Sequence, residues 1–110
     1  MLESTSSARL VLTTAASRDE AVQLGRTLVE ERLAACATLV PAAESIYRWE
    51  SKIESSAEIL LLLKTASDRL SALEARLLEL HSYQTPEFLV LDVEGGSHKY
   101  LAWLHACLHA

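Results

Sequence analysis

The chain has few basic residues and no cluster of them. Its 110 residues include 10 Lys and Arg against 15 Asp and Glu, which gives a formal net charge of −5. A surface that binds nucleic-acid phosphates is normally basic. The balance therefore argues against a nucleic-acid partner and mildly favours cations as ligands.

Long apolar runs are also absent. The longest, residues 59–63, falls far short of the ~20 residues that a helix needs to cross a bilayer. Residues 1–7 are short, polar and not basic, so we expect a flexible N-terminus there rather than a signal peptide. These observations predict a soluble, cytoplasmic protein without a membrane partner.

The two cysteines, Cys36 and Cys107, lack the C-x-x-C spacing of metal and redox motifs. Both lie in apolar stretches, and a reducing cytosol gives them no drive to pair with each other. We therefore expect two free thiols rather than a disulfide.

The common catalytic motifs are missing as well. The sequence contains no G-x-S-x-G, no Walker loop and no H-E-x-x-H, and Gly95-Gly96 is typical of a turn rather than of a phosphate cradle. Nothing in the sequence indicates an enzyme.

The most distinctive feature that is present is a pair of long β-prone runs, residues 35–50 and 53–64, which meet at Ser51-Lys52. Each is longer than the roughly 5–6 residues of an ordinary strand. Alternation along the first run places Tyr47 and Trp49 on one face. A two-stranded ribbon is at best marginally stable alone, so we expect this arm to lie against a neighbouring subunit, with Trp49 as an interface anchor.

Local signals predict the first half of the fold. An apolar strand over residues 9–14 precedes Ser17, which with Glu20 forms a capping box for a helix that runs to about residue 33. Gly25 lies inside this helix, where a glycine is costly, and so indicates a close approach of the helix to a sheet.

Similar signals predict the second half. Thr65 or Ser67 can cap a second helix with a core stripe, a strand covers residues 87–93, and Ser97 can cap a terminal helix. The order β-α-β-β-α-β plus a final helix predicts an α+β, ferredoxin-like fold in one domain, residues 8–110. The stripe of the second helix comprises Leu70, Leu73, Leu77 and Leu80.

Five blocks of sequence carry a resemblance to a known family: ERLAAC at 31–36, SIYRW at 45–49, KT at 64–65, YQTPE at 83–87 and YLAWL at 100–104. In order and spacing they resemble the CutA family of divalent-cation-tolerance proteins, over residues 10–104. The resemblance implies a ferredoxin-like fold, an intertwined, PII-like homotrimer with clefts between subunits, and a tolerance phenotype that concerns copper and other divalent ions.

The metal-site hypothesis that we rank first pairs His81 with Glu87, on either side of the loop 83–86. Imidazole suits copper and zinc, a carboxylate can complete such a site, and a third ligand has to come from elsewhere or from a second subunit. The alternative is that His81 closes the second helix and Glu87 is solvated. By the resemblance, relatives usually have a proline where this chain has Ser82, and the serine is expected to loosen the loop. Some relatives have a cysteine where this chain has Thr13, and its absence is expected to weaken copper binding.

Other candidates remain open. His105 and His109 share a helical face at i, i+4 spacing, a recognised ligand spacing, or else they only complement the helix end. Glu58 and Lys64 lie on one face of the second β-prone run, residues 53–64. They form either a charge pair at a solvent-exposed edge or part of a cleft. The resemblance places Trp49, Glu58, Lys64 and Tyr83 at the intersubunit cleft.

Three functions are consistent with these features. The first is a non-enzymatic homotrimer that binds divalent cations, copper or zinc, at clefts between subunits. The second is a PII-like signalling trimer that binds a small anionic metabolite there, which Lys64 favours. The third is a structural scaffold without a ligand.

Overall fold

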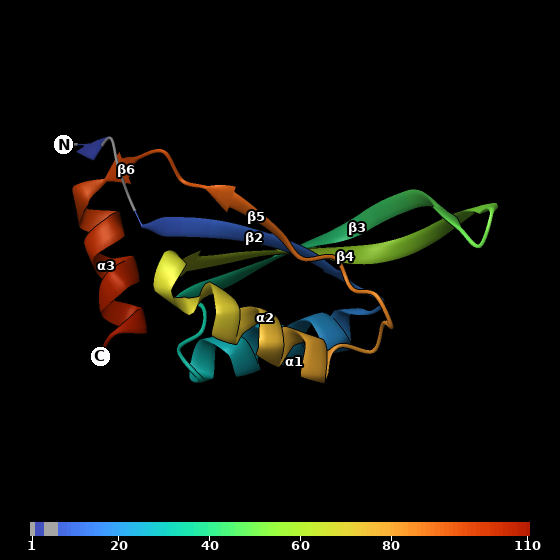
Figure 1. The fold of residues 1–110 in the computed structure, drawn as a ribbon, viewed down its shortest axis with the longest axis horizontal. Helices are drawn as coiled ribbons and strands as arrows, with labels where there is room; N and C mark the ends of the chain where they lie inside the picture. Colours follow the sequence, from blue (N-terminus) through green and yellow to red (C-terminus); the bar gives the residue numbers. More distant parts are fainter. Residues whose placement is uncertain (1, 4–6) are drawn as a thin grey trace.

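The protein is described here from a computed structural model, which describes residues 2–3 and 7–110. An antiparallel sheet with strand order β3-β4-β2-β5 forms its centre. Helices α1 and α2 lie along one face of this sheet, α3 lies at one end, and β3 and β4 project beyond the helices as a twisted arm (Figure 1). The main elements are β2 (Ala8–Ala15), α1 (Arg18–Glu30), β3 (Cys36–Trp49), β4 (Lys52–Ala66), α2 (Leu70–Leu80), β5 (Leu89–Asp92) and α3 (His98–Leu108).

The predicted α+β class and element order are confirmed. A short 3-10 turn, Ser67–Arg69, precedes α2, and a second, two-stranded sheet pairs β1 (Leu2–Glu3) with β6 (Gly96–Ser97). The predicted flexible N-terminus, residues 1–7, lies partly outside the described residues. Its described part includes Leu2–Glu3, which no sequence signal assigned to a strand.

Helix α1 begins as predicted and ends earlier. The Ser17 hydroxyl accepts a hydrogen bond from the Glu20 N–H at 3.2 Å, so Ser17 is the N-cap. The helix ends at Glu30 rather than near residue 33, because Arg32 adopts a left-handed φ of 58°. The Leu33 N–H then bonds back to the Leu28 carbonyl at 2.9 Å, which is typical of a helix terminus.

The predicted caps of α2 are wrong. Thr65 stays in β4, where its hydroxyl donates to the Leu33 carbonyl at 2.7 Å, and the N-cap residue Arg69 makes no side-chain cap bond. The predicted core stripe is confirmed. Leu73 and Leu77 are fully buried, and Leu70 and Leu80 pack against the same core.

The arm is built as a hairpin with a tight turn. Glu50 and Ser51 both have positive φ, 48° and 67°, which matches the two-residue turns that join twisted antiparallel strands. Trp49 pairs with Lys52 across this turn, and a register shift between Val40 and Ala43 interrupts the regular pairing of β3 with β4.

One face of the sheet forms the main core. Val11, Leu61 and Leu63 are fully buried against leucines of α1 and α2. Gly25 of α1 lies so close to β3 that a Cβ atom there would meet the Ala37 Cβ at 3.0 Å, which confirms the predicted close approach. Burial of this face stabilises the single chain.

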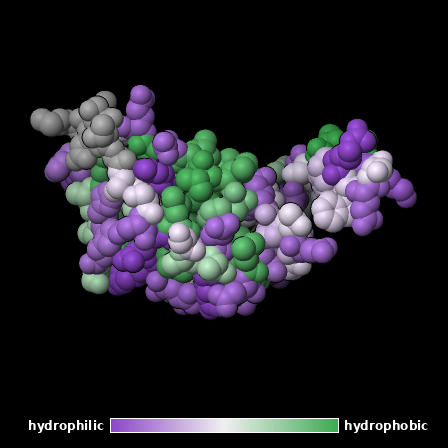
Figure 2. Space-filling view, in the orientation of Figure 1, coloured by the Kyte–Doolittle hydropathy of each residue, from purple (hydrophilic) through white to green (hydrophobic). Residues whose placement is uncertain are grey.

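The opposite face of the sheet is largely apolar and has neither α1 nor α2 on it (Figure 1). Leu10 pairs with Leu91 and Leu12 pairs with Leu89 across β2 and β5, and the β5 leucines are 43% and 56% exposed. Figure 2 shows apolar residues gathered beside β5 in the middle of the molecule. A contiguous exposed apolar face of this kind is typical of a contact surface. We call it the open leucine face and define it as Leu10, Leu12, Leu62, Leu89 and Leu91.

The cysteines are free, as predicted: Cys36 begins β3, Cys107 lies near the end of α3, and both are half-buried. Among the described residues, no helix is both long and apolar enough to span a membrane.

Candidate functional site

A cleft of about 570 Å³ lies between the arm and the loop that follows α2. This volume is in the range of small-molecule sites, roughly 300–1,000 Å³. The arm and the loop provide its walls, and Thr14 at the end of β2 contributes as well. The lining residues are Thr14, Ser45, Ile46, Tyr47, Trp49, Glu58, Tyr83, Gln84, Thr85 and Glu87.

Glu58 is the most unusual of these residues, because its carboxyl group is ionisable and it is only 8% exposed. The Tyr83 hydroxyl donates to its Oε2 at 2.6 Å. Burial alone raises the pKa of Glu58, but hydrogen bonds from the hydroxyls of Ser45, Tyr83 and Thr14 outweigh this effect and lower it below the usual 4.5. Glu58 is therefore a buried anion at neutral pH.

The described lining of the cleft includes no Lys and no Arg. Its charged members are Glu58 and Glu87, both carboxylates. Hydroxyl donors stabilise Glu58 without neutralising it, so the cleft retains a negative field. Such a field attracts cations and disfavours anions.

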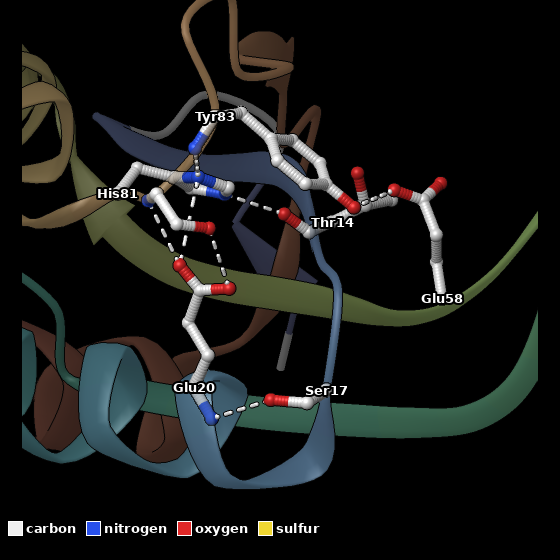
Figure 3. Close-up of polar contacts among 7 residues, drawn as sticks. Thr14, Ser17, Glu20, Glu58, His81 and Tyr83 are labelled. Atoms are coloured by element: carbon white, nitrogen blue, oxygen red, sulfur yellow. Dashed lines mark hydrogen bonds and ion pairs between the residues drawn. The ribbon is translucent and has the colours of Figure 1, made fainter.

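His81, the first predicted metal ligand, is engaged at both ring nitrogens. Its side chain has no exposed surface. The Tyr83 N–H donates to Nδ1 at 3.0 Å, and Nε2 lies 2.7 Å from the Thr14 carbonyl oxygen (Figure 3). A carbonyl can only accept, so Nε2 carries the proton and the ring is the neutral Nε2–H tautomer.

These bonds give His81 a structural role, because its side chain joins the start of the loop to β2. The metal site predicted on His81 and Glu87 stays a prediction, and it would require the ring to give up one of its two bonds. Among the described residues, no three His, Cys, Asp or Glu side chains are grouped so that they could hold a metal ion.

Glu20 holds the same loop from the other side. Its carboxylate accepts from the Ser82 N–H at 2.9 Å and from the Ser82 hydroxyl at 3.0 Å (Figure 3). The sequence pattern predicted that this carboxylate would bond the Ser17 N–H in a capping box. It bonds Ser82 instead, which corrects that prediction. The two bonds also oppose the loosening expected from a serine at this position.

Tyr83 connects the loop to the arm. Its ring lies 4.7 Å from the His81 ring, centroid to centroid, and its hydroxyl reaches Glu58. Burial and the adjacent Glu58 carboxylate raise the pKa of Tyr83, so the phenol stays protonated and remains a donor. The chain of contacts therefore runs from β2 through His81 and Tyr83 to β4.

Of the residues predicted at the cleft, Trp49, Glu58 and Tyr83 line it, together with Glu87 from the predicted metal pair. Lys64 is not among the lining residues of this cleft in the described chain, and its place at a cleft between subunits stays a prediction. Its Nζ donates to the Thr38 hydroxyl at 2.9 Å, six residues along β4 from Glu58.

The terminal histidines have partners within the chain. His109 Nε2 lies 2.7 Å from the Asp68 carboxylate, and its Nδ1 lies 2.9 Å from the His105 carbonyl oxygen. His105 lies 3.3 Å from the Ser7 hydroxyl. These contacts fit the predicted role at the helix end and leave the alternative metal site at His105 and His109 without a grouped third ligand in the described residues.

Known proteins of one family match the chain over most of its length. A CutA protein of Pectobacterium atrosepticum, named divalent-cation tolerance protein, is 46% identical over 99 residues, 90% of each chain. The crystal structure of CutA from Xylella fastidiosa has a TM-score of 0.92 at 41% identity and covers 94% of this chain and 99% of its own. CutA of Synechococcus elongatus has a TM-score of 0.94 at 39% identity and covers 98% of this chain and 96% of its own.

The family model described as "CutA1 divalent ion tolerance protein" matches residues 9–107. The match spans the arm, every residue of the cleft and the central sheet except Ala8, the first residue of β2. The chain therefore belongs to the CutA1 divalent ion tolerance protein family.

Proposed function

We propose that this protein is a cytoplasmic, non-enzymatic homotrimer that binds divalent cations in the cleft, with the carboxylates of Glu58 and Glu87 as ligands. The single observation that carries the proposal is the buried, ionised Glu58, which faces a cleft without a basic residue among its described lining. Relatives that are named divalent-cation tolerance proteins support the same role.

A buried charge needs compensation. Taking a carboxylate out of water is costly, and proteins offset this cost by pairing the charge or by coordinating a metal ion. Three hydroxyls share the cost at Glu58 but supply no positive charge. A divalent cation between Glu58 and Glu87 would complete the compensation.

The donors of the cleft also bear on the choice of ion. Carboxylate and hydroxyl oxygens suit hard ions such as Mn²⁺, Mg²⁺ and Ca²⁺, whereas copper and zinc favour imidazole. The engaged His81 ring leaves oxygen as the donor type of the cleft. The residues present thus fit a hard divalent ion, and copper or zinc would need His81 released or a ligand from another subunit.

The open leucine face and the projecting arm support the homotrimer. Both expose apolar side chains in a single chain, with Ile46 71% and Ile53 62% exposed along the arm. Two further copies would cover these surfaces, as the resemblance implies. The scaffold alternative shares this assembly but gives no reason for the buried Glu58, and the anionic-metabolite alternative conflicts with the two carboxylates of the cleft.

Calorimetric titration with Mn²⁺, Zn²⁺ and Cu²⁺ tests the proposal. Glu58→Gln and Glu87→Gln should each weaken binding of the preferred ion about tenfold or more, because each removes a charged ligand. Glu94→Gln is the matched control, since Glu94 is exposed and outside the cleft. Equal affinity in the wild type and both cleft variants would sink the carboxylate site.

A further inference from the structure

The cleft holds an unusual share of the chain's aromatic residues. The sequence has 2 Trp, 3 Tyr and 1 Phe, and half of these residues line this one cavity. Tyr47 and Trp49 come from the arm, and Tyr83 comes from the loop after α2. An aromatic cluster on two separate elements beside two carboxylates is more than a single divalent ion requires.

The hydroxyls of both tyrosines already have partners. Tyr47 lies 2.8 Å from the Ser56 hydroxyl, and Tyr83 donates to Glu58. What Tyr47 and Tyr83 offer a ligand is therefore chiefly ring surface. Trp49, next to the turn of the arm, adds the largest ring to the lining of the cleft.

We infer that the cleft binds a small organic ammonium cation, a quaternary or tertiary amine. Such a group is attracted to the electron-rich faces of aromatic rings, and several rings around one site recognise N-methyl groups. The carboxylates of Glu58 and Glu87 supply the opposite charge. A cavity of about 570 Å³ has room for an organic ligand of this class, whereas a metal ion would occupy little of it.

This inference rests on the role of Glu58 in the proposed function and extends it from inorganic to organic cations. The two ligands use the same carboxylates, so they should compete. The rings matter only to the organic cation, because a hard metal ion takes oxygen ligands. This difference separates the two ideas by experiment.

The test compares choline with its neutral carbon analogue, 3,3-dimethylbutan-1-ol, by calorimetric titration of the purified protein. The two molecules have nearly the same shape, and choline alone is charged. Choline should bind about 5- to 30-fold more tightly, as expected for cation–π attraction in a partly desolvated site. Equal binding of the two molecules, or no choline binding at millimolar concentration, overturns the inference.

Two variants place the ligand. Trp49→Leu should weaken choline binding about fivefold or more while Mn²⁺ binding is retained, and Trp103→Leu, outside the cleft, should change neither. The mass of each variant is measured in the same sample. If Trp49→Leu does not assemble, the wild-type comparison with the neutral analogue still decides.

The outcomes for the two ideas are distinct. Mn²⁺ binding without choline binding overturns this inference and leaves the proposed function in place. Choline binding that is lost in Glu58→Gln, without any metal binding, supports the inference and removes the metal role. Full choline affinity in Glu58→Gln overturns the inference, because the carboxylate would then supply no attraction.

Discussion

Leu91→Asp is expected to convert the assembled protein into folded monomers. Leu91 is 43% exposed in the single chain, so an aspartate there costs the isolated fold little. In an assembly that covers the open leucine face, the same change removes apolar burial and forces a carboxylate out of water. Light scattering should give a mass near 12.1 kDa for the variant and about three times that for the wild type.

Leu78→Asp is the matched control for this prediction. Leu78 is also an exposed leucine, at 50%, but it lies on α2, on the other side of the sheet. It should leave the mass unchanged, and far-ultraviolet circular dichroism should show intact secondary structure in both variants. A trimeric Leu91→Asp would show that the open leucine face is not the contact surface.

His81→Ala should lower the free energy of unfolding by about 2–4 kcal/mol. The change leaves a cavity where the ring has no exposed surface, and it removes the partners of the Thr14 carbonyl and the Tyr83 N–H. Urea unfolding at one protein concentration measures the loss, with His105→Ala as the control near the chain terminus.

A second readout shows whether His81 holds the loop in place. Hydrogen exchange at the Tyr83 amide should become faster in His81→Ala, because that N–H donates to Nδ1 in the wild type. Unchanged stability together with a protected Tyr83 amide would mean that another contact positions the loop. His81 would then be available as a ligand.

Much of the fold follows from short-range patterns in the sequence. Residues within a few positions of one another determine the Ser17 cap, the leucine stripe of α2 and the β-propensity of the two long strands. Thr65 shows where such patterns stop being sufficient. Its hydroxyl binds the carbonyl of Leu33, 32 residues away, so a residue that can cap a helix remains inside a strand.

The same limit applies to the site. The resemblance placed Trp49, Glu58 and Tyr83 at a cleft between subunits, and the sequence paired Glu87 with His81. In the single chain, Trp49, Glu58, Tyr83 and Glu87 line one cleft, whereas the site between subunits stays a prediction. The sequence could not predict that Nε2 of His81 forms a hydrogen bond with the carbonyl of Thr14, 67 residues away. A histidine next to a carboxylate indicates a metal ligand only while its nitrogens are free, and that depends on tertiary contacts.

The pH dependence of metal affinity tests the central claim most directly, because carboxylate and imidazole ligands lose metal in different pH ranges. The pKa of Glu58 is lowered below 4.5, so Glu58 stays ionised down to that range. We therefore predict that Mn²⁺ affinity stays constant as the pH falls from 8 through about 6.5, the unperturbed pKa of histidine, and declines only below about 5. A decline that begins near pH 6.5 in the wild type, and is absent in His81→Ala, would contradict the carboxylate site and make His81 the ligand.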